Sequence, residues 1–344
     1  MPPQDRFLIV TTSDRYDLDW ERATLASITD IQIDLLPGAP EDEAELIALG
    51  RDAHALLISS RESVSRHVVE SLRNCRVISR YAVGLDHVDL QAAADRGIVV
   101  THFPDYCTNE VADHAMALIL SLNRRIVQFD RDLRGGAWTR HGHHMYRILR
   151  GPIPALREMT LGLVGLGRIG AEVALRAKPF CLRVVASDPH LDAATIRARG
   201  AEPVDLPTLL ATADAVSLHC PLTPETRGLI GAAAIAAMKP GAMLVNTARG
   251  PIVDLPAAIH ALRTGALAAA AFDVVDPEPL PADSPLYAME QVILSPHAAY
   301  YSERSVETVR SETFFAAIDV LRGRRPRIIA NPAVLDRVSL GARV

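Results

Sequence analysis

The chain contains few cysteines, few aromatic residues and almost no lysine. Its 344 residues include four cysteines and 5% aromatic residues, and Lys178 and Lys239 are the only lysines among 36 basic residues. The cysteines show no CxxC spacing, which argues against a disulfide scaffold and suits a reducing compartment. The scarcity of lysine reflects composition rather than function, because the arginines are scattered along the chain.

Long apolar runs and an excess of positive charge are also missing. No stretch of about 18 apolar residues is free of charge, and the N-terminal segment MPPQDRFLIV is not a basic leader followed by a long apolar run. The formal net charge of −5 provides no basic surface for nucleic acid or an anionic membrane. We therefore expect a cytoplasmic protein with no membrane-spanning helix and no nucleic-acid partner.

Short apolar runs alternate along the chain with stretches rich in Ala and Leu that have helical periodicity. This pattern predicts an α/β protein in which helices cover parallel sheets. A chain of this length favours two domains, since a domain typically has roughly 100–200 residues. The early strands are expected at Phe7–Thr11, Ile31–Leu35, Ala55–Ile58, Val77–Arg80 and Val99–Thr101.

The rest of the chain is expected to contain one long helix, one irregular segment and a second β/α series. The long helix begins near Thr108 and ends near Arg125, with acidic residues in its first turn and arginines in its last, as the helix dipole favours. Residues 135–156 are rich in Gly, His, Arg and Pro and are expected to be irregular. The second series covers 160–296, and the tail 301–321 has the periodicity of an amphipathic helix.

A G-x-G-x-x-G motif follows the first strand of the second series. Gly165 permits a tight turn, Gly167 lets the backbone approach a pyrophosphate, and Gly170 permits close packing of strand and helix. The helix expected over Ala171–Lys178 supplies free N–H groups for the phosphates. Because a strand, the turn and a helix occur in this order, the motif predicts a Rossmann-type dinucleotide site rather than a structural turn. Arg168 and Ile169, inside the motif, belong to the predicted cofactor-binding set.

An acidic residue ends the next strand and indicates which dinucleotide binds. Asp188 lies about where an acid reaches the adenosine ribose hydroxyls, some 20 residues beyond the glycines. Its charge repels a 2′-phosphate, and Pro189 stands where an arginine would suit NADP. The predicted cofactor is therefore NAD.

Charged or titratable residues follow three later strands. They are Arg249, Asp273, Glu278 and His297, and they would lie at the edge of the sheet where ligands bind. A nicotinamide oxidoreductase needs a proton donor beside the hydride acceptor and a cation for the substrate, and these residue types provide both. The strands are expected at Ala242–Val245, Ala268–Phe272 and Val292–Leu294.

Seven segments occur along the chain in the order RYAVGLDHVDL, PDYCTNEVADH, GLGRIG, SLHCPLTPETRGLI, NTARG, DVVDPEP and SPHAAYYS. Together they resemble the D-isomer-specific 2-hydroxyacid dehydrogenase family, which includes the phosphoglycerate dehydrogenases, and most closely its C-terminal-binding-protein branch. The resemblance implies two Rossmann-like or flavodoxin-like domains with parallel sheets: a discontinuous substrate domain over 1–103 and 301–344, and an inserted NAD-binding domain over 104–300.

The resemblance also implies an activity, reversible hydride transfer between NAD(H) and a 2-oxoacid or D-2-hydroxyacid. Arg249 matches the arginine that binds the substrate carboxylate and carbonyl, for which a planar guanidinium fork is well suited. His297 matches the acid/base, and Glu278 matches the carboxylate paired with it, which stabilises the protonated imidazole.

Further positions match cofactor- and substrate-binding residues of the family. Asp273 matches the residue that hydrogen-bonds the nicotinamide amide. The loop Ala82–Gly84, with Arg80 beside it, matches the loop that binds the substrate carboxylate, and Tyr300 matches the aromatic wall of the substrate site. Ala82 replaces a glycine of many relatives, and Tyr300 replaces a tryptophan of the C-terminal-binding proteins. The remaining matched residues are Val83 and Gly84 for substrate, and Cys107, Thr108, Cys220, Pro221, Thr226, Thr247 and Ala248 for cofactor.

Several alternatives stay open. Arg80 could be held in an ion pair inside the smaller domain. The cluster His141, His143 and His144 has no carboxylate or cysteine at ligand spacing, so we interpret it as a polar loop and expect no metal. An NAD(H)-sensing corepressor role and action on an inorganic oxyanion such as phosphite are alternative functions. A homodimer through the NAD domain is expected from the resemblance.

Overall fold

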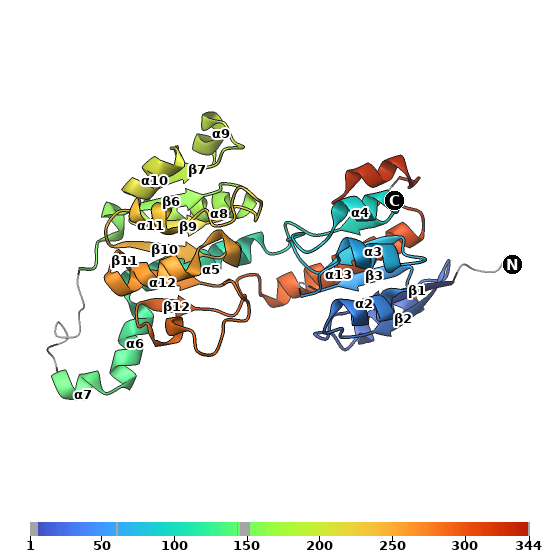
Figure 1. Ribbon diagram of the computed structural model, residues 1–344, viewed down its shortest axis with the longest axis horizontal. Helices are drawn as coiled ribbons and strands as arrows, with labels where there is room; N and C mark the ends of the chain where they lie inside the picture. The colour runs from blue at the N-terminus through green and yellow to red at the C-terminus, as the bar shows by residue number, and fades with distance from the viewer. Residues whose placement is uncertain (1–5, 60, 143, 145–151, 343–344) are drawn as a thin grey trace. The chain divides into compact units, whose positions relative to one another are not determined.

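The computed structural model describes residues 6–59, 61–142, 144 and 152–342. The chain divides into two compact units: unit 1 comprises Met1–Tyr106 with Ser302–Val344, and unit 2 comprises Cys107–Tyr301. Figure 1 shows that each unit has its own sheet. Unit 1 is discontinuous in sequence, and the expected boundaries at 103/104 and 300/301 lie close to the limits of the units.

Unit 1 is built on a five-stranded sheet in the order β2-β1-β3-β4-β5, in which every pairing is parallel. Side chains alternate between its faces, so that Ile9 and Leu57 pack into one core with Phe314 of α13, whereas Val10 and Leu56 pack into the other. The strands are β1 (Arg6–Thr11), β2 (Gln32–Pro37), β3 (Ala55–Ile58), β4 (Val77–Arg80) and β5 (Val99–Thr101). The helices are α1 (Asp19–Ala26), α2 (Glu43–Gly50), α3 (Arg66–Ser71), α4 (Leu90–Asp95) and α13 (Glu303–Leu321).

Unit 2 is built on a seven-stranded parallel sheet in the order β12-β11-β10-β9-β6-β7-β8. The strand order reverses between β6 and β9, which is the switch point where a doubly wound sheet binds its ligand. The predicted α/β class with parallel sheets is confirmed. The strands are β6 (Thr160–Val164), β7 (Arg183–Ser187), β8 (Glu202–Pro203), β9 (Ala215–Leu218), β10 (Ala242–Asn246), β11 (Leu267–Phe272) and β12 (Val292–Leu294). The α-helices are α5 (Thr108–Arg124), α6 (Ile126–Arg134), α7 (Ala137–His141), α8 (Arg168–Ala177), α9 (Ala193–Ala198), α10 (Leu206–Thr212), α11 (Ala232–Ala236) and α12 (Leu255–Thr264).

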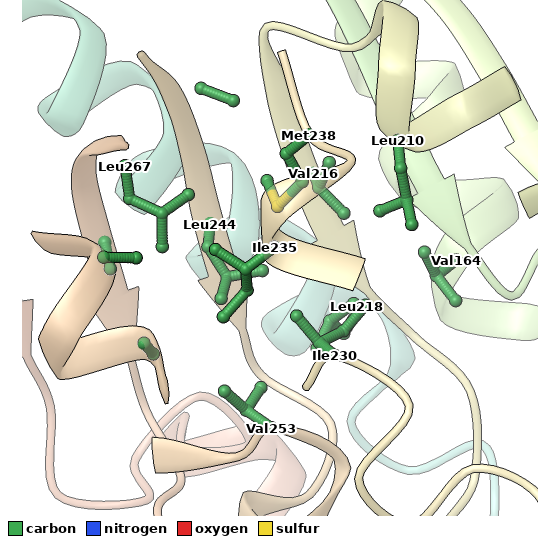
Figure 2. Packing of buried hydrophobic residues seen from close by; sticks show 14 of the residues in the cluster. Val164, Leu210, Val216, Leu218, Ile230, Ile235, Met238, Leu244, Val253 and Leu267 are labelled. Carbon is green, nitrogen blue, oxygen red and sulfur yellow. The ribbon is translucent and has the colours of Figure 1, made fainter. Parts of the chain in front are cut away.

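Hydrophobic cores cover both faces of the unit 2 sheet. Figure 2 shows the core on one face, where Leu218 of β9 and Leu244 of β10 lie among Ile230, Ile235 and Val253. On the other face, Val245 of β10 packs in the same core as residues of α5 and α8. A parallel sheet buried on both faces leaves the ends of its strands as the place for polar side chains and ligands.

The long helix agrees with its expected bounds and ends at Arg124, because Arg125 adopts a left-handed backbone conformation with φ 55°. A separate helix α6, which was not predicted, follows it, and two expectations are corrected. Helix α7 lies inside the segment expected to be irregular. Helix α8 begins at Arg168 rather than Ala171, so part of the glycine motif forms its first turn.

The described residues also bear on membrane and metal binding. No helix among them is both long enough and apolar enough to cross a membrane. Within the same part of the chain, no group of three or more His, Cys, Asp and Glu side chains is arranged to hold a metal ion. His143, one member of the histidine cluster, lies outside the described residues.

Candidate active site

The glycine motif forms a tight turn between β6 and α8. Gly165 has φ 89°, and a Cβ atom there would lie 2.8 Å from the Cys220 backbone nitrogen. A Cβ atom at Gly170 would lie 2.3 Å from the Gly165 carbonyl oxygen, whereas one at Gly167 would meet no atom within 4 Å. Gly165 and Gly170 are therefore required by the fold itself. Gly167 leaves open space beside the N-terminus of α8, as a bound pyrophosphate requires.

Asp188 holds the same turn from the neighbouring strand. Its Oδ2 accepts a hydrogen bond from the Leu166 backbone N–H at 2.9 Å, and its Oδ1 accepts one from the His190 N–H at 3.0 Å. The Arg199 guanidinium donates to the Leu166 carbonyl oxygen at 2.5 Å. The carboxylate is half-buried and has lone pairs left for the hydroxyls of a ribose.

His219 lies beneath the turn, at the end of β9. Its Nε2 is 2.9 Å from the Ser217 hydroxyl oxygen, and burial lowers the pKa of the imidazole to about 4. His219 is therefore neutral at neutral pH. Next to it, burial raises the pKa of the Cys220 thiol to about 11, with a further contribution from the Asp188 charge. Cys220 is thus a thiol that packs beside the turn rather than a nucleophile.

The end of β10 positions Arg249. Asn246 orders the backbone around it, since its amide oxygen accepts from the Ala248 N–H at 3.0 Å and its amide nitrogen donates to the Arg249 carbonyl at 2.9 Å. A Cβ atom at Gly250 would lie 2.0 Å from the Val275 carbonyl oxygen. The absence of that atom lets the Arg249 segment lie directly against the loop that follows β11.

Thr247, between Asn246 and Ala248, has a feature that fits a bound ligand. Its hydroxyl oxygen is buried and has no hydrogen-bond partner among the residues that the structure describes. A buried hydroxyl without a partner costs about 1–3 kcal/mol, so such atoms are usually satisfied by water or a ligand. This orphaned hydroxyl and the space at Gly167 fit the predicted dinucleotide.

His297 and Glu278 form a hydrogen-bonded pair at the ends of β12 and β11. His297 Nδ1 lies 2.8 Å from Glu278 Oε1, and the side chains are 39% and 43% exposed. The ionised carboxylate only accepts hydrogen bonds, so Nδ1 carries the proton in this bond and Nε2 is left for another partner. The Tyr300 ring lies 6.4 Å from the imidazole ring, in an edge-on arrangement.

The backbone after β12 is held by Asp273, the residue that directly follows β11. The N–H groups of His297, Ala298 and Ala299 donate in turn to the Asp273 carbonyl oxygen, Oδ1 and Oδ2, at 2.8, 2.9 and 3.1 Å. Oδ1 also accepts from the Ser295 hydroxyl at 2.6 Å. This set of bonds holds His297 in its left-handed conformation, with φ 52°.

Three of the predicted cofactor positions have a defined place in the local fold. Thr226 Oγ1 accepts from the Thr223 N–H at 2.8 Å and donates to the Pro221 carbonyl at 2.7 Å, so this hydroxyl closes a turn. Cys107 is buried at the position preceding α5, and Thr108 is the first residue of that helix.

The predicted substrate loop belongs to unit 1. Arg80 is buried at the end of β4, and the loop Ala82–Gly84 follows it. His102 Nδ1 lies 2.7 Å from the Val83 carbonyl oxygen, and the Phe103 N–H donates to the Ala82 carbonyl at 3.3 Å. The loop carbonyls are thus bound within unit 1.

In unit 2, Arg249, Asp273, Glu278 and His297 follow the neighbouring strands β10, β11 and β12. The structure adds residues that sequence reasoning left out. His114, Gly250 and Ser295 lie inside quoted motifs, but only their contacts reveal them. Arg199 lies outside every motif, and no signal in the sequence pointed to it. A glycine-rich turn at a switch point, with a histidine–carboxylate pair at the same sheet edge, is typical of nicotinamide-dependent oxidoreductases.

Comparisons with known proteins identify the family. Residues 116–299 match the profile of the "D-isomer specific 2-hydroxyacid dehydrogenase, NAD binding domain". The chain is 40% identical over 298 residues to a glyoxylate reductase of Thermofilum pendens, covering 86% of each protein. It is 40% identical over 255 residues to a D-3-phosphoglycerate dehydrogenase of Archaeoglobus fulgidus, covering 74% of this chain and 47% of that protein.

A solved structure agrees with these sequence matches. The D-lactate dehydrogenase of Aquifex aeolicus, complexed with NAD and lactic acid, superimposes with a TM-score of 0.78 at 25% identity, covering 96% of this chain and 98% of that one. The chain belongs to the D-isomer-specific 2-hydroxyacid dehydrogenase family. It is an NAD-dependent oxidoreductase that acts on the CH–OH group of a 2-hydroxyacid.

Proposed function

We propose that this protein reversibly reduces a 2-oxoacid to a D-2-hydroxyacid, with His297 as acid/base, Glu278 as its partner and Arg249 as the substrate-binding cation. The observation that carries the proposal is the 2.8 Å contact between His297 Nδ1 and Glu278 Oε1 beyond adjacent strands. The Arg249 segment is packed against the loop that leads from β11 to Glu278.

The hydride for the substrate carbonyl carbon would come from NADH held at the glycine turn. His297 donates the Nε2 proton to the carbonyl oxygen, while Glu278 holds Nδ1 and stabilises the positive charge of the imidazolium. In the oxidation direction the neutral imidazole accepts the proton of the hydroxyl group. Arg249 binds the carboxylate and polarises the carbonyl, because its guanidinium presents several donors in one plane.

The residues of the glycine turn hold the cofactor in this proposal. The N–H groups at the start of α8, with Gly165, Gly167, Arg168, Ile169 and Gly170, bind the pyrophosphate, and Asp188 binds the ribose. Asp273 has limited capacity for the nicotinamide amide. Its Oδ1 already accepts two hydrogen bonds, so any direct contact falls to Oδ2, which accepts one. The other proposed contacts are Cys107, Thr108, Cys220, Pro221, Thr226, Thr247 and Ala248.

Unit 1 acts as the substrate domain in this proposal. The N–H groups of Val83 and Gly84 bind the substrate carboxylate, and Arg80 supports the loop from below. The bonds to the Ala82 and Val83 carbonyls favour this role, because they fix the loop conformation from within unit 1. Tyr300 contributes an aromatic side wall.

The substrate class is tested by following NADH oxidation against a panel of 2-oxoacids. The panel contains glyoxylate, hydroxypyruvate, phosphohydroxypyruvate, pyruvate and branched 2-oxoacids, which includes the substrates suggested by the names of the relatives. We expect turnover of at least one compound, and loss of that turnover in Arg249→Ala. Failure with every compound, despite tight NADH binding, would favour an NAD(H)-sensing binding protein instead.

We also propose a homodimer through unit 2 and a cytoplasmic location. Helix α6 exposes Ile126 and Val127, and α7 exposes Trp138, whose residue surface is 60% accessible. Exposed apolar side chains gathered on neighbouring helices favour a protein–protein contact. Light scattering of the purified protein measures the mass directly, and a monomer would contradict this part of the proposal.

A further inference from the structure

Three side chains from separate elements form a hydrogen-bonded chain behind the loop of His297. His114, in the second turn of α5, places Nε2 at 3.0 Å from the Ser295 hydroxyl oxygen. Ser295 lies directly after β12, and its hydroxyl is 2.6 Å from Asp273 Oδ1, after β11. His114 Nε2 is itself 3.7 Å from that carboxylate oxygen. All three residues belong to unit 2.

The direction of each bond follows from chemistry. The buried Asp273 carboxylate accepts, so the single hydroxyl proton of Ser295 points to it. The Ser295 oxygen then accepts a hydrogen bond from His114, which must carry its hydrogen on Nε2. A hydroxyl group that donates one hydrogen bond and accepts another has a single orientation. Ser295 is thereby fixed as the donor of the shortest bond to Asp273.

The chain of bonds leads from a rigid helix to the backbone of the proposed acid/base. Helix α5 is anchored by buried residues on both sides of His114, including Ala112, Ala115 and Ile119. At the other end, Asp273 accepts the N–H groups of His297 and the two residues after it. Small displacements of an acid/base relative to its substrate cost large factors in rate.

We propose that His114 is a positioning residue for the hydride-transfer reaction, acting through Ser295 and Asp273 on the orientation of His297. This inference rests on the proposed acid/base role of His297. His114 does not touch the reacting atoms in this scheme. It keeps the Ser295 hydroxyl directed at Asp273, and so keeps the loop after β12 in the conformation that pairs His297 with Glu278.

The test compares His114→Ala, His114→Gln and Ser295→Ala with the wild type in steady-state kinetics. The glutamine amide nitrogen can occupy the place of Nε2 and donate to Ser295. We expect His114→Ala to lower kcat about tenfold, with the Kd for NADH changed less than about twofold. His114→Gln should recover most of the loss. His260→Ala, an exposed histidine on α12 of the same unit, is the matched control and should keep the wild-type kcat.

A double variant separates a chain of bonds from independent contacts. Ser295→Ala should reproduce the loss without altering α5, and His114→Ala with Ser295→Ala should be no slower than either single variant. The proposal would be overturned if the double variant lost kcat by the product of the two single losses. It would also be overturned if His114→Gln were as slow as His114→Ala. His297→Ala is measured in parallel. If His297→Ala is inactive while His114→Ala is fully active, only the positioning role of His114 is contradicted. If His297→Ala is itself fully active, the proposed acid/base role of His297 is contradicted as well.

Discussion

The polar groups beyond the unit 2 strands fall into two sets that differ in burial. The inner set comprises Asp273, whose residue surface is 3% accessible, and the half-buried His219, and both bond to neighbouring protein groups. The outer set, Glu278 and His297, is about two-fifths exposed, and a hydrogen bond joins its two side chains. Two carboxylates five positions apart therefore do different work: one shapes the loops, and the other is placed to handle a proton.

Burial explains the division. A buried charge must be satisfied by the protein, and Asp273 has four donors from backbone and side chains within hydrogen-bond distance of its carboxylate and carbonyl. A group saturated in this way has little capacity to exchange a proton with a ligand. The outer set keeps that capacity because His297 Nε2 is not used by the pair. Substitutions should therefore affect stability in the inner set and turnover in the outer set.

The largest expected effect is on turnover in the outer set. His297→Ala should lower kcat by about 10² to 10⁴, since it removes the general acid/base. The Kd for NADH and the free energy of unfolding should stay close to wild type, because the side chain is partly exposed. Steady-state kinetics measures kcat, fluorescence titration measures the Kd for NADH, and urea denaturation measures the free energy of unfolding. A fall in stability equal to that of an inner-set variant would break the comparison.

The second effect is on stability in the inner set. Asp273→Asn keeps the shape but turns one acceptor into a donor that faces N–H or O–H groups, which should cost about 3 kcal/mol of unfolding free energy. Urea denaturation measures this cost. Glu278→Gln is the matched control, and it should change stability by less than about 0.5 kcal/mol while lowering kcat. Equal stability losses in the two variants would show that burial does not separate them.

The third effect concerns pH and the buried histidine. Because the pKa of His219 is lowered to about 4 in the folded protein, the unfolded chain binds the proton more tightly. The stability from its neutral form is fully present above about pH 6.5 and is lost as the pH falls toward 4, by up to about 3 kcal/mol. His219→Gln should flatten the profile of urea midpoints in this range. The same slope in wild type and variant would contradict the assignment.

The smallest effect concerns Gly167 and Gly170, two glycines of the same turn whose replacement by alanine should have different consequences for stability and for NADH binding. Gly167→Ala should leave the melting temperature unchanged, since its Cβ meets no protein atom within 4 Å, but weaken NADH binding by about tenfold or more. Gly170→Ala places a Cβ atom 2.3 Å from a backbone oxygen and should destabilise the fold itself. Calorimetric melting and NADH titration of both variants test this difference. An unchanged Kd for NADH in Gly167→Ala would show that the pyrophosphate does not bind beside Gly167.

The sequence predicted strands more reliably than helix ends. The strands at Ala55–Ile58, Val77–Arg80 and Val292–Leu294 agree with the structure residue by residue, because buried parallel strands are short apolar runs with sharp polar ends. Helix α6 was not predicted. Its boundary depends on the left-handed conformation of Arg125, a non-glycine residue, and the pattern of apolar residues does not signal such a break.

The candidate site was predictable where a residue type and a strand end coincide, as at Arg249 and His297. It was not predictable where the role depends on a partner distant in sequence. His114 and Ser295 are separated by 181 positions, and their contact arises only when α5 packs beside the sheet. In the same way, Gly250 looks like one more glycine until the backbone of Val275 lies against it.

The return of the chain to unit 1 has a consequence for synthesis on the ribosome. Residues 1–106 emerge first, but one face of their sheet is completed by Phe314 and Ile318 of α13. Ser79 likewise bonds to the Thr313 carbonyl oxygen across a separation of 234 positions. Unit 2 is continuous and can fold as soon as its own residues have emerged. The segment 1–106 is therefore translated before unit 2 but completes its core after it, and it remains open to chaperones until α13 has left the exit tunnel.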